Sequence, residues 1–317
     1  MARSGKRRGC LIPLLIILVV AAVVIGGWYI LAGRVPSPTP IPPSPEPPVS
    51  QPASCPDVQV VAIPGTWESS AADDPYNPTA NPASLMLNVT RPLQEQFDTS
   101  RADVYTVPYV AQFSNPVAIP PDGQQSYNNS RAAGTTATND FLMKRHAECP
   151  LTSYVLTGFS QGAVIAGDVA ASIGDGTGAV PADLVLGVGL IADGRRDPAF
   201  GNTVGPSVAG VGAELSLNGL KLPGLTMTGP RPGGFGDLND RTYQICAPSD
   251  GICDAPAAAL NPTNWLSSAP RLLEYYNNPV HAMYNSFQVD PNGTTATQWM
   301  AQWAAEKIDA APTPPHS

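Results

Sequence analysis

The sequence predicts an α/β fold, in which a mostly parallel central sheet carries helices on both faces and forms a three-layer sandwich. Two observations support this prediction. Apolar and β-branched runs of strand length alternate along the chain with segments of helical spacing. One junction between such a strand and helix, residues 158–162, reads G-F-S-Q-G. This is the G-x-S-x-G pattern of a nucleophile elbow, which needs a strand before it and a helix after it.

The first 34 residues predict a membrane anchor. Four basic residues between Arg3 and Arg8 precede an almost continuously apolar run from Leu11 to Ala32. Such a run can cross a bilayer as a helix, and its basic flank favours the cytoplasmic side. We therefore expect a single-pass protein whose remaining domain lies outside the cytoplasm. The alternative is a signal peptide that is cleaved to release a secreted protein, but the run exceeds the usual signal core and no A-x-A site follows.

Residues 35–54 are dominated by Pro, Ser and Thr and predict a semi-rigid spacer. It leads to a domain at residues 55–310, and residues 311–317 are expected to form a disordered tail. The chain has a net charge of −8 although its N-terminus is basic, so the domain is acidic. This argues against nucleic acid as a partner and against electrostatic binding to anionic lipid, so any lipid contact should be apolar.

Strand and helix signals alternate through the domain. The expected strands are residues 58–63, 103–107, 154–157, 184–191 and 242–245. The expected helices are the later part of 81–97, then 127–149, 163–171 and 297–308. Residues 195–240 interrupt this rhythm with Gly, Pro, Leu and few charges, which predicts a long irregular excursion. It could be a lid or lipid-contact region over an active site, or a surface insertion without a catalytic role.

Four cysteines beyond the apolar run, Cys55, Cys149, Cys246 and Cys253, predict two disulfides. Three pairings are possible. Cys246 and Cys253 are close in sequence and are expected to close a local loop, which leaves Cys55 to pair with Cys149 over a long span. A zinc site is the alternative, but the spacing lacks C-x2-C and histidines are scarce. We expect neither a metal nor a cofactor.

The elbow serine, Ser160, needs a base and an orienting carboxylate to act as a nucleophile. Of the three histidines, His146 lies on a helix end that reads as a solvated face, and His316 lies in the tail. In α/β-hydrolases the chain order is serine, acid, histidine. The base predicted by elimination is therefore His281.

The acid must lie between Ser160 and His281. Asp168 falls within the helix after the elbow and should point the wrong way, whereas Asp193 ends a strand and is a fair candidate. Asp250 directly follows a strand, in the loop that the second disulfide would close, and that closure would hold its carboxylate against a histidine ring. Asp250 is the best candidate on placement. The other acidic candidates are Asp175, Asp183, Asp197, Asp237, Asp240, Asp254 and Glu274.

Several ordered motifs, covering roughly residues 55–290, resemble the cutinase family. They are the G-F-S-Q-G elbow, a C-x3-D-x2-C loop that carries Asp250, and an H-x-x-Y pair formed by His281 and Tyr284. Cys55 and Cys149 match the first disulfide of that family in position. The distances along the chain from the elbow to the acid, and from the acid to the histidine, are longer than in the fungal enzymes.

The resemblance implies a catalytic triad of Ser160, Asp250 and His281, with an oxyanion hole formed by the Gln161 backbone N–H and Thr66. The anchor, spacer and excursion look most like the membrane-anchored cutinase-like lipases and phospholipases of mycolic-acid-containing bacteria. That subgroup implies a monomeric serine esterase that hydrolyses long-chain lipid esters or thioesters in the cell envelope, as a phospholipase A or a thioesterase. An acyltransferase or a short-chain carboxylesterase would use the same triad, and a non-catalytic binding module is a third possibility.

Overall fold

The computed structural model describes residues 11–32, 49–116, 118–259, 261, 268 and 278–317. The chain divides into two compact units, Met1–Pro47 and Pro48–Ser317. In the first unit the apolar run forms helix α1 (Leu11–Ala32). Over the described parts of the chain, however, no helix meets the requirements of length and hydropathy for crossing a membrane. The predicted transmembrane anchor is therefore not supported.

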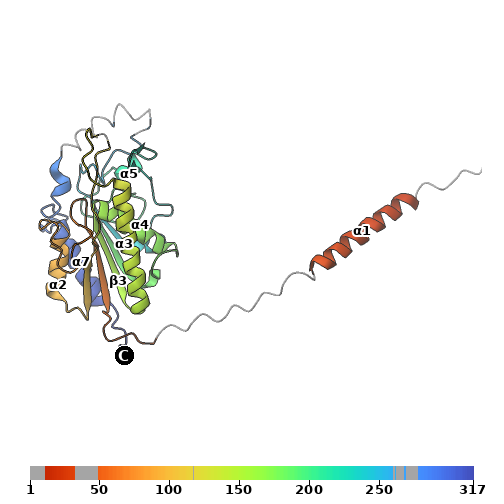
Figure 1. The fold of residues 1–317 in the computed structure, drawn as a ribbon, viewed down its shortest axis with the longest axis horizontal. Helices are drawn as coiled ribbons and strands as arrows, with labels where there is room; N and C mark the ends of the chain where they lie inside the picture. Colours follow the sequence, from red (N-terminus) through yellow and green to blue (C-terminus); the bar gives the residue numbers. More distant parts are fainter. Residues whose placement is uncertain (1–10, 33–48, 117, 260, 262–267, 269–277) are drawn as a thin grey trace, which may run out of the picture. The chain divides into compact units, whose positions relative to one another are not determined.

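The second unit is built on a six-stranded sheet in the order β2-β1-β3-β4-β8-β5 (Figure 1). Its strands are β1 (Val58–Ile63), β2 (Ala102–Thr106), β3 (Ser153–Phe159), β4 (Val185–Ile191), β5 (Asn202–Val204) and β8 (Thr242–Ile245). All their pairings are parallel. The long helices are α2 (Leu87–Gln96), α3 (Tyr127–Glu148), α4 (Gln161–Gly174) and α7 (Ala296–Ala310). The α/β class and the parallel sheet are confirmed.

The three layers follow from the alternation of side chains along buried strands. All six residues of β1 are buried. Val60 and Ala62 join a cluster with residues of α2 and α7, whereas Val61 and Ile63 join a second cluster with residues of α3 and α4. The helices therefore cover opposite faces of the sheet, α2 and α7 on one and α3 and α4 on the other (Figure 1).

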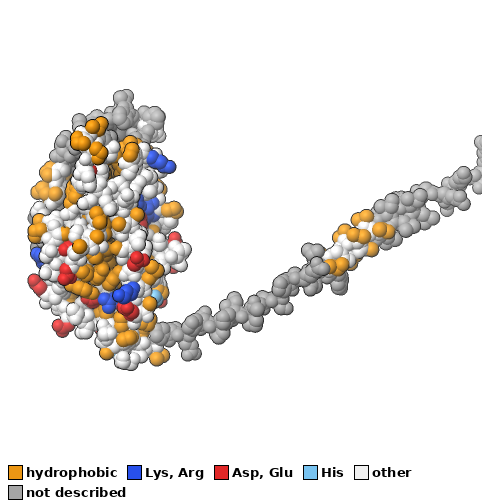
Figure 2. Space-filling view, in the orientation of Figure 1, with side chains coloured by type: hydrophobic (Ala, Val, Ile, Leu, Met, Phe, Trp, Pro, Cys, Tyr) orange, Lys and Arg blue, Asp and Glu red, His pale blue; other side chains and the backbone are white. Residues whose placement is uncertain are grey.

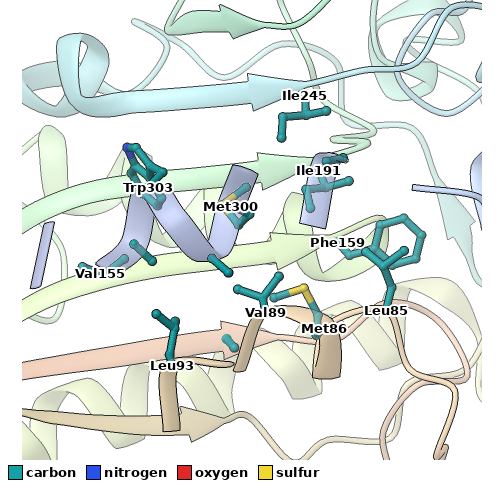
Figure 3. Packing of buried hydrophobic residues seen from close by; sticks show 14 of the residues in the cluster. Leu85, Met86, Val89, Leu93, Val155, Phe159, Ile191, Ile245, Met300 and Trp303 are labelled. Carbon is teal, nitrogen blue, oxygen red and sulfur yellow. The ribbon is translucent and has the colours of Figure 1, made fainter. Parts of the chain in front are cut away.

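The first cluster anchors the loop that leads into α2 beside the end of β3 (Figure 3). Leu85 and Met86 come from that loop, and Phe159 is the last residue of β3. Met300 and Trp303 of α7 close the same face of the sheet. This packing holds the residue before Ser160 against an element far away in the sequence.

The ends of α3 and α7 show why these segments become helices. The Ser126 side chain accepts a hydrogen bond from the Asn129 N–H at the start of α3. Thr295 and Gln298 form a reciprocal capping box at the start of α7. Each cap satisfies backbone N–H groups that have no partner inside the helix, so both helices begin within one residue of the predicted position.

Both disulfides form as predicted, Cys55 with Cys149 and Cys246 with Cys253. The zinc alternative is wrong, because all four sulfur atoms are bonded in pairs. On the face of the domain drawn in Figure 2, basic side chains occur in small separate groups among apolar and acidic ones.

Residues 195–240 are more ordered than the sequence predicted. They contain β5, which extends the main sheet, and the helix α5 (Ala213–Ser216). They also contain a small hairpin, β6 (Lys221–Leu222) with β7 (Leu225–Thr226), and all but the last residue of the short helix η2 (Gly236–Arg241). The sequence missed β5 because it has three residues and none of them is buried, so no apolar strand pattern exists there.

A largely buried ionic network ties this excursion to α3 and α4. The Asp168 carboxylate of α4 accepts from Arg231 Nε and Arg195 Nη1, each at 2.8 Å, and pairs with Arg131 of α3. Arg131 also reaches Glu214 of α5 at 3.1 Å. Of the described residues, none between 195 and 240 lines the cavity beside Ser160. The lid interpretation is therefore unsupported, and the surface insertion is the reading that fits.

The C-terminal segment, which was expected to form a disordered tail at residues 311–317, makes hydrogen bonds to the start of the domain. His316 Nε2 lies 2.9 Å from Asp57 Oδ1, and this hydrogen bond raises the pKa of His316. The Ser317 N–H donates to Gln51 O at 2.9 Å, and Gln51 N–H donates to Pro315 O at the same distance. The domain therefore exceeds the predicted limits of 55–310 at both ends.

Candidate active site

The elbow serine stands on a strained turn between β3 and α4. Ser160 has φ 55° and ψ −120°, a conformation that costs a non-glycine residue about 1–3 kcal/mol. A Cβ atom on Gly158 would lie 2.3 Å from the Gly162 carbonyl oxygen, and one on Gly162 would lie 2.1 Å from Ile63 O. Both glycines are therefore required sterically, as the motif predicts.

Ser160, His281 and Asp250 form a continuous chain of hydrogen bonds. Ser160 Oγ lies 2.9 Å from His281 Nε2. His281 Nδ1 lies 3.0 Å from Asp250 Oδ1 and 2.9 Å from Oδ2. Asp250 can only accept, so we assign the imidazole proton to Nδ1, which donates to the carboxylate. Nε2 is then free to accept from the serine hydroxyl. The structure thus brings together the three residues that were selected from the sequence. Ser160 lies in the elbow, Asp250 in the loop after β8, and His281 in the single-turn helix η3 (Pro279–Ala282).

The two rejected acids lie elsewhere. Asp193 is buried and accepts from Arg231 through both of its oxygens, at 2.6 and 3.1 Å. Asp168 belongs to the same network. Neither carboxylate is among the described partners of His281, so the preference for Asp250 on placement agrees with the geometry.

Asp250 is 1% exposed and is oriented by two further donors. The Tyr284 hydroxyl donates to Oδ2 at 2.7 Å, and the Ile252 N–H donates to Oδ1 at 2.9 Å. Tyr284 OH itself accepts from the Ala247 N–H at 2.9 Å. Burial, with the neighbouring Asp250 charge, raises the pKa of Tyr284 well above its usual value, so the phenol keeps its proton and remains a donor. The sequence pattern included Tyr284 but did not assign it this function.

The Cys246–Cys253 disulfide closes the loop that carries Asp250, and its removal should have a measurable effect. We expect the double variant Cys246→Ala/Cys253→Ala to lose about 2–3 kcal/mol of stability, the closure entropy of a short loop. Its kcat should fall as well, because Asp250 loses its fixed position. Thermal unfolding and initial ester-hydrolysis rates measure the two effects. If the folded variant keeps the full rate, Tyr284 and the Ile252 N–H suffice to orient Asp250.

Phe159 packs against the imidazole of His281. Its ring is stacked on the His281 imidazole, with centroids 5.2 Å apart and planes inclined by 26°. Tyr284 packs edge-on against the same Phe159 ring. This position is variable in the G-x-S-x-G pattern, so the sequence did not indicate the contact.

The two groups expected to form an oxyanion hole lie on neighbouring elements. Gln161 is the first residue of α4, where backbone N–H groups have no helical partner. Thr66 follows β1 and its Oγ1 lies 3.5 Å from the Gln161 side-chain amide. Both residues are therefore at the end of the sheet where Ser160 lies.

The Gln161 side chain is buried and organises this region. Its amide lies 3.1 Å from Ser130 Oγ and 3.4 Å from the Tyr109 hydroxyl. Each of these two hydroxyls donates its own proton to a backbone carbonyl at 2.7 Å, so each can only accept from the amide. We therefore assign the NH₂ group of Gln161 to this side.

Glu68 is a buried carboxylate that the sequence analysis missed. It accepts from the Gly65 N–H at 2.9 Å and from the Leu85 N–H. Burial raises the pKa of Glu68, and these two backbone donors oppose that shift. Because Gly65 and Glu68 enclose Thr66, the contact fixes the turn that presents the threonine hydroxyl. An acidic residue just after the first strand was the available sequence signal.

A cavity of about 440 Å³ opens beside Ser160, within the range of small-ligand sites. Its apolar lining residues come from segments before and after Ser160 in the sequence. The residues that line it are Thr66, Trp67, Glu68, Asn81, Ala83, Leu85, Asn88, Phe113, Phe159, Ser160, Ile252, His281, Ala282 and Asn285. Over the described residues, no group of three or more His, Cys, Asp or Glu is placed to hold a metal ion.

Comparison with known proteins gives a consistent family. A family model described as Cutinase matches residues 54–269. The chain is 52% identical over 270 residues to a carboxylesterase Culp6 homolog of Corynebacterium glutamicum, covering 83% of this chain and 84% of that protein. It is 31% identical over 172 residues to a cutinase of Kineococcus radiotolerans, covering 53% of this chain and 48% of that protein. An acetylxylan esterase structure, with 17% identity and a TM-score of 0.50, covers 80% of this chain and 100% of its own, and supports the fold alone.

Proposed function

Because this chain belongs to the cutinase family and is a carboxylic ester hydrolase, we propose that it hydrolyses long-chain lipid esters or thioesters through Ser160, His281 and Asp250. The observation that supports these roles is the unbroken chain of hydrogen bonds from the elbow serine to a buried carboxylate. Phospholipase A or thioesterase activity is the form of this function that we propose.

The proposed mechanism gives each group a distinct role. Ser160 Oγ attacks the acyl carbonyl carbon while His281 Nε2 takes the hydroxyl proton. Asp250 holds the imidazole tautomer and stabilises the imidazolium. The Gln161 N–H and the Thr66 hydroxyl donate to the oxyanion. His281 then returns its proton to the leaving oxygen or sulfur, and water releases the acyl group by the same steps.

The oxyanion role of Thr66 is open to a direct test. We expect Thr66→Val to lower kcat by about 10²–10³-fold, the usual loss for one oxyanion donor, with little change in KM. Thr66→Ser keeps a hydroxyl and should retain most of the rate. Steady-state kinetics on one ester measures both variants. If Thr66→Val kept the wild-type kcat, the backbone N–H of Gln161 would be the sufficient donor and the role of Thr66 would be lost.

The apolar lining supports a lipid substrate. Leu85, Phe113, Phe159 and Ile252 surround the space beside Ser160. The domain is acidic, so an anionic head group would gain nothing from the overall charge. Affinity for a lipid ester would therefore come from burial of its acyl chain, at about 0.8 kcal/mol per methylene.

The test of this function is covalent labelling together with an acyl-length series. We expect a fluorophosphonate probe to label wild-type protein and not Ser160→Ala. We also expect hydrolysis of p-nitrophenyl esters to be faster for long acyl chains than for short ones. A maximum at short chains would overturn the lipid assignment, and folded protein without labelling would indicate a binding module. Product analysis with an added alcohol would reveal acyl transfer.

We also propose that the catalytic domain works outside the cytoplasm. The support is chemical, because the Cys55–Cys149 and Cys246–Cys253 disulfides persist in oxidising compartments. The proposed location is the cell envelope, and the alternative is a protein released outside the cell. Cell fractionation with antibody detection would test it, and recovery in the reducing cytoplasm would contradict it.

A further inference from the structure

Trp67 has a strained backbone conformation and a large apolar side chain that is exposed to solvent. It follows Thr66, has φ 64°, and is 61% exposed to solvent. A bulky residue in the left-handed region costs about 1–2 kcal/mol, and an exposed indole recovers little of that by burial. Such strain persists only where the surroundings enforce it, and it is concentrated at functional sites.

Three hydrogen bonds enforce the conformation. The Trp67 N–H donates to Ala111 O at 2.6 Å, and Trp67 O accepts from Asn81 Nδ2 at 3.1 Å. The indole Nε1–H donates to Gln124 Oε1 at 2.6 Å. The backbone on both sides and the ring tip are therefore held, so the ring is fixed in place although most of its surface is in water.

The fixed ring offers a ligand only its apolar surface. The indole N–H already has a partner in Gln124, so it is not available to a substrate hydroxyl or carbonyl. The nearby carboxylate of Glu68 is occupied by two backbone N–H groups. Phe113, Ala83 and Leu85 line the same cavity as Trp67. A wall of this kind can bind a hydrocarbon chain through apolar contact.

We propose that Trp67 determines specificity for acyl length, by binding the part of a long acyl chain that extends away from Ser160. This inference rests on the proposed function and names the surface that selects its substrate. The chain lies along the ring in the enzyme–substrate complex and in the acyl-enzyme. A short acyl group occupies only the part of the cavity next to Ser160 and does not reach the ring. The contribution of Trp67 is therefore to binding of long chains, and not to the bond-breaking steps.

The test compares full-length wild-type protein, Trp67→Ala and Trp67→Phe on p-nitrophenyl butanoate and p-nitrophenyl hexadecanoate, which share one leaving group. For Trp67→Ala we expect kcat/KM to fall about 10–50-fold on the hexadecanoyl ester, as loss of contact with two or three methylenes predicts. The loss should appear in KM, with kcat nearly unchanged, and the butanoyl ester should change less than about 3-fold. Trp67→Phe keeps an apolar ring and should retain much of the preference. Met143→Ala, which removes a similarly exposed apolar side chain from α3, is the matched control and should change neither ester.

Two results would overturn the inference. An equal loss on both esters would mean that Trp67 acts through Thr66 next to it, and unchanged rates on both would mean that no chain lies on the ring. The fluorophosphonate labelling rate of Trp67→Ala should equal that of wild type, which establishes that the variant is folded and its serine reactive. Failure of the proposed function itself would look different, since wild-type protein would then either remain unlabelled or hydrolyse the butanoyl ester faster than the hexadecanoyl ester.

The variant Trp67→Gly tests whether the positive φ at this position costs stability. Glycine adopts positive φ without penalty, so Trp67→Gly should melt at a temperature no lower than wild type while losing the preference for long chains. A clear loss of stability in Trp67→Gly would show that the indole is kept for folding, and would contradict a role in specificity.

Discussion

Replacement of Ser160 by alanine is expected to lower kcat for ester hydrolysis by about 10⁵–10⁶-fold, the size of loss seen when a serine nucleophile is removed. Thermal stability should change little. Alanine meets the same positive φ as serine at this turn, and the substitution removes one side-chain hydrogen bond, to His281.

The measurement is the hydrolysis rate at saturating ester together with a thermal unfolding curve. Ser207→Ala, an exposed serine in the 195–240 excursion, is the control and should be indistinguishable from wild type. A rate for Ser160→Ala within tenfold of wild type would show that the elbow serine is not the nucleophile, whatever its distance from His281.

Replacement of Arg231 by alanine should have the largest effect on stability. Its guanidinium is 4% exposed and bridges Asp193 and Asp168. Removal of one partner from a buried ion pair leaves uncompensated charge and costs about 3–5 kcal/mol. We therefore expect a clear drop in the denaturant midpoint for Arg231→Ala. Arg91→Ala, at an exposed position of α2, should stay within about 0.5 kcal/mol of wild type. Similar midpoints for the two variants would contradict the stabilising role of the network.

The same network gives stability a defined dependence on pH. Burial alone would raise the pKa of Asp168, but Arg231, Arg131 and Arg195 together hold it below the usual value. A carboxyl whose folded-state pKa is lowered stabilises the protein above its unfolded-state pKa of about 3.9, and that contribution is lost as the pH falls through the folded-state value. Wild-type stability should therefore fall below about pH 4, and an Asp168→Asn variant should show a smaller fall.

The ion pairs of residues 195–240 also argue against this segment as a lid over Ser160. Arg195, Glu214 and Arg231 belong to the excursion and are bonded to α3 and α4. Opening of this segment would break several buried ion pairs at once, which makes it a poor candidate for a lid. The region that we expect to contact substrate is instead the short turn at Thr66 and Trp67, which Glu68 and Gln124 hold in place.

Much of the site could be predicted because its signals are local in sequence. The glycines around Ser160 are needed by the turn itself, since side chains there would strike the Gly162 and Ile63 carbonyls. The close spacing of Cys246 and Cys253 predicted their disulfide and placed Asp250 in a closed loop. With few histidines in the chain, elimination pointed to His281.

What the sequence could not reveal depends on groups that are far apart in the chain. The pairing of Asp193 and Asp168 with Arg231, and of His316 with Asp57, follows from which surfaces pack together. The same holds for β5, whose residues carry no apolar pattern and pair with β8 only because the sheet offers an edge there. A single charged or polar residue has no periodicity, so its partner is unpredictable until the fold brings the two together.

By itself, then, the sequence indicated the α/β class, the elbow, both disulfides and the residues Ser160, His281 and Asp250. The elbow and the Cys246–Cys253 loop follow from steric and spacing rules within a short segment, whereas the Cys55–Cys149 pair and His281 followed by elimination. The tertiary structure alone decided which acids are bound by arginine, how Gln161 and Glu68 orient Thr66, and that Trp67 stands strained at the mouth of the cavity. The physical reason is that a buried polar group must find its hydrogen-bond partner in space, and many of those partners lie dozens of residues away.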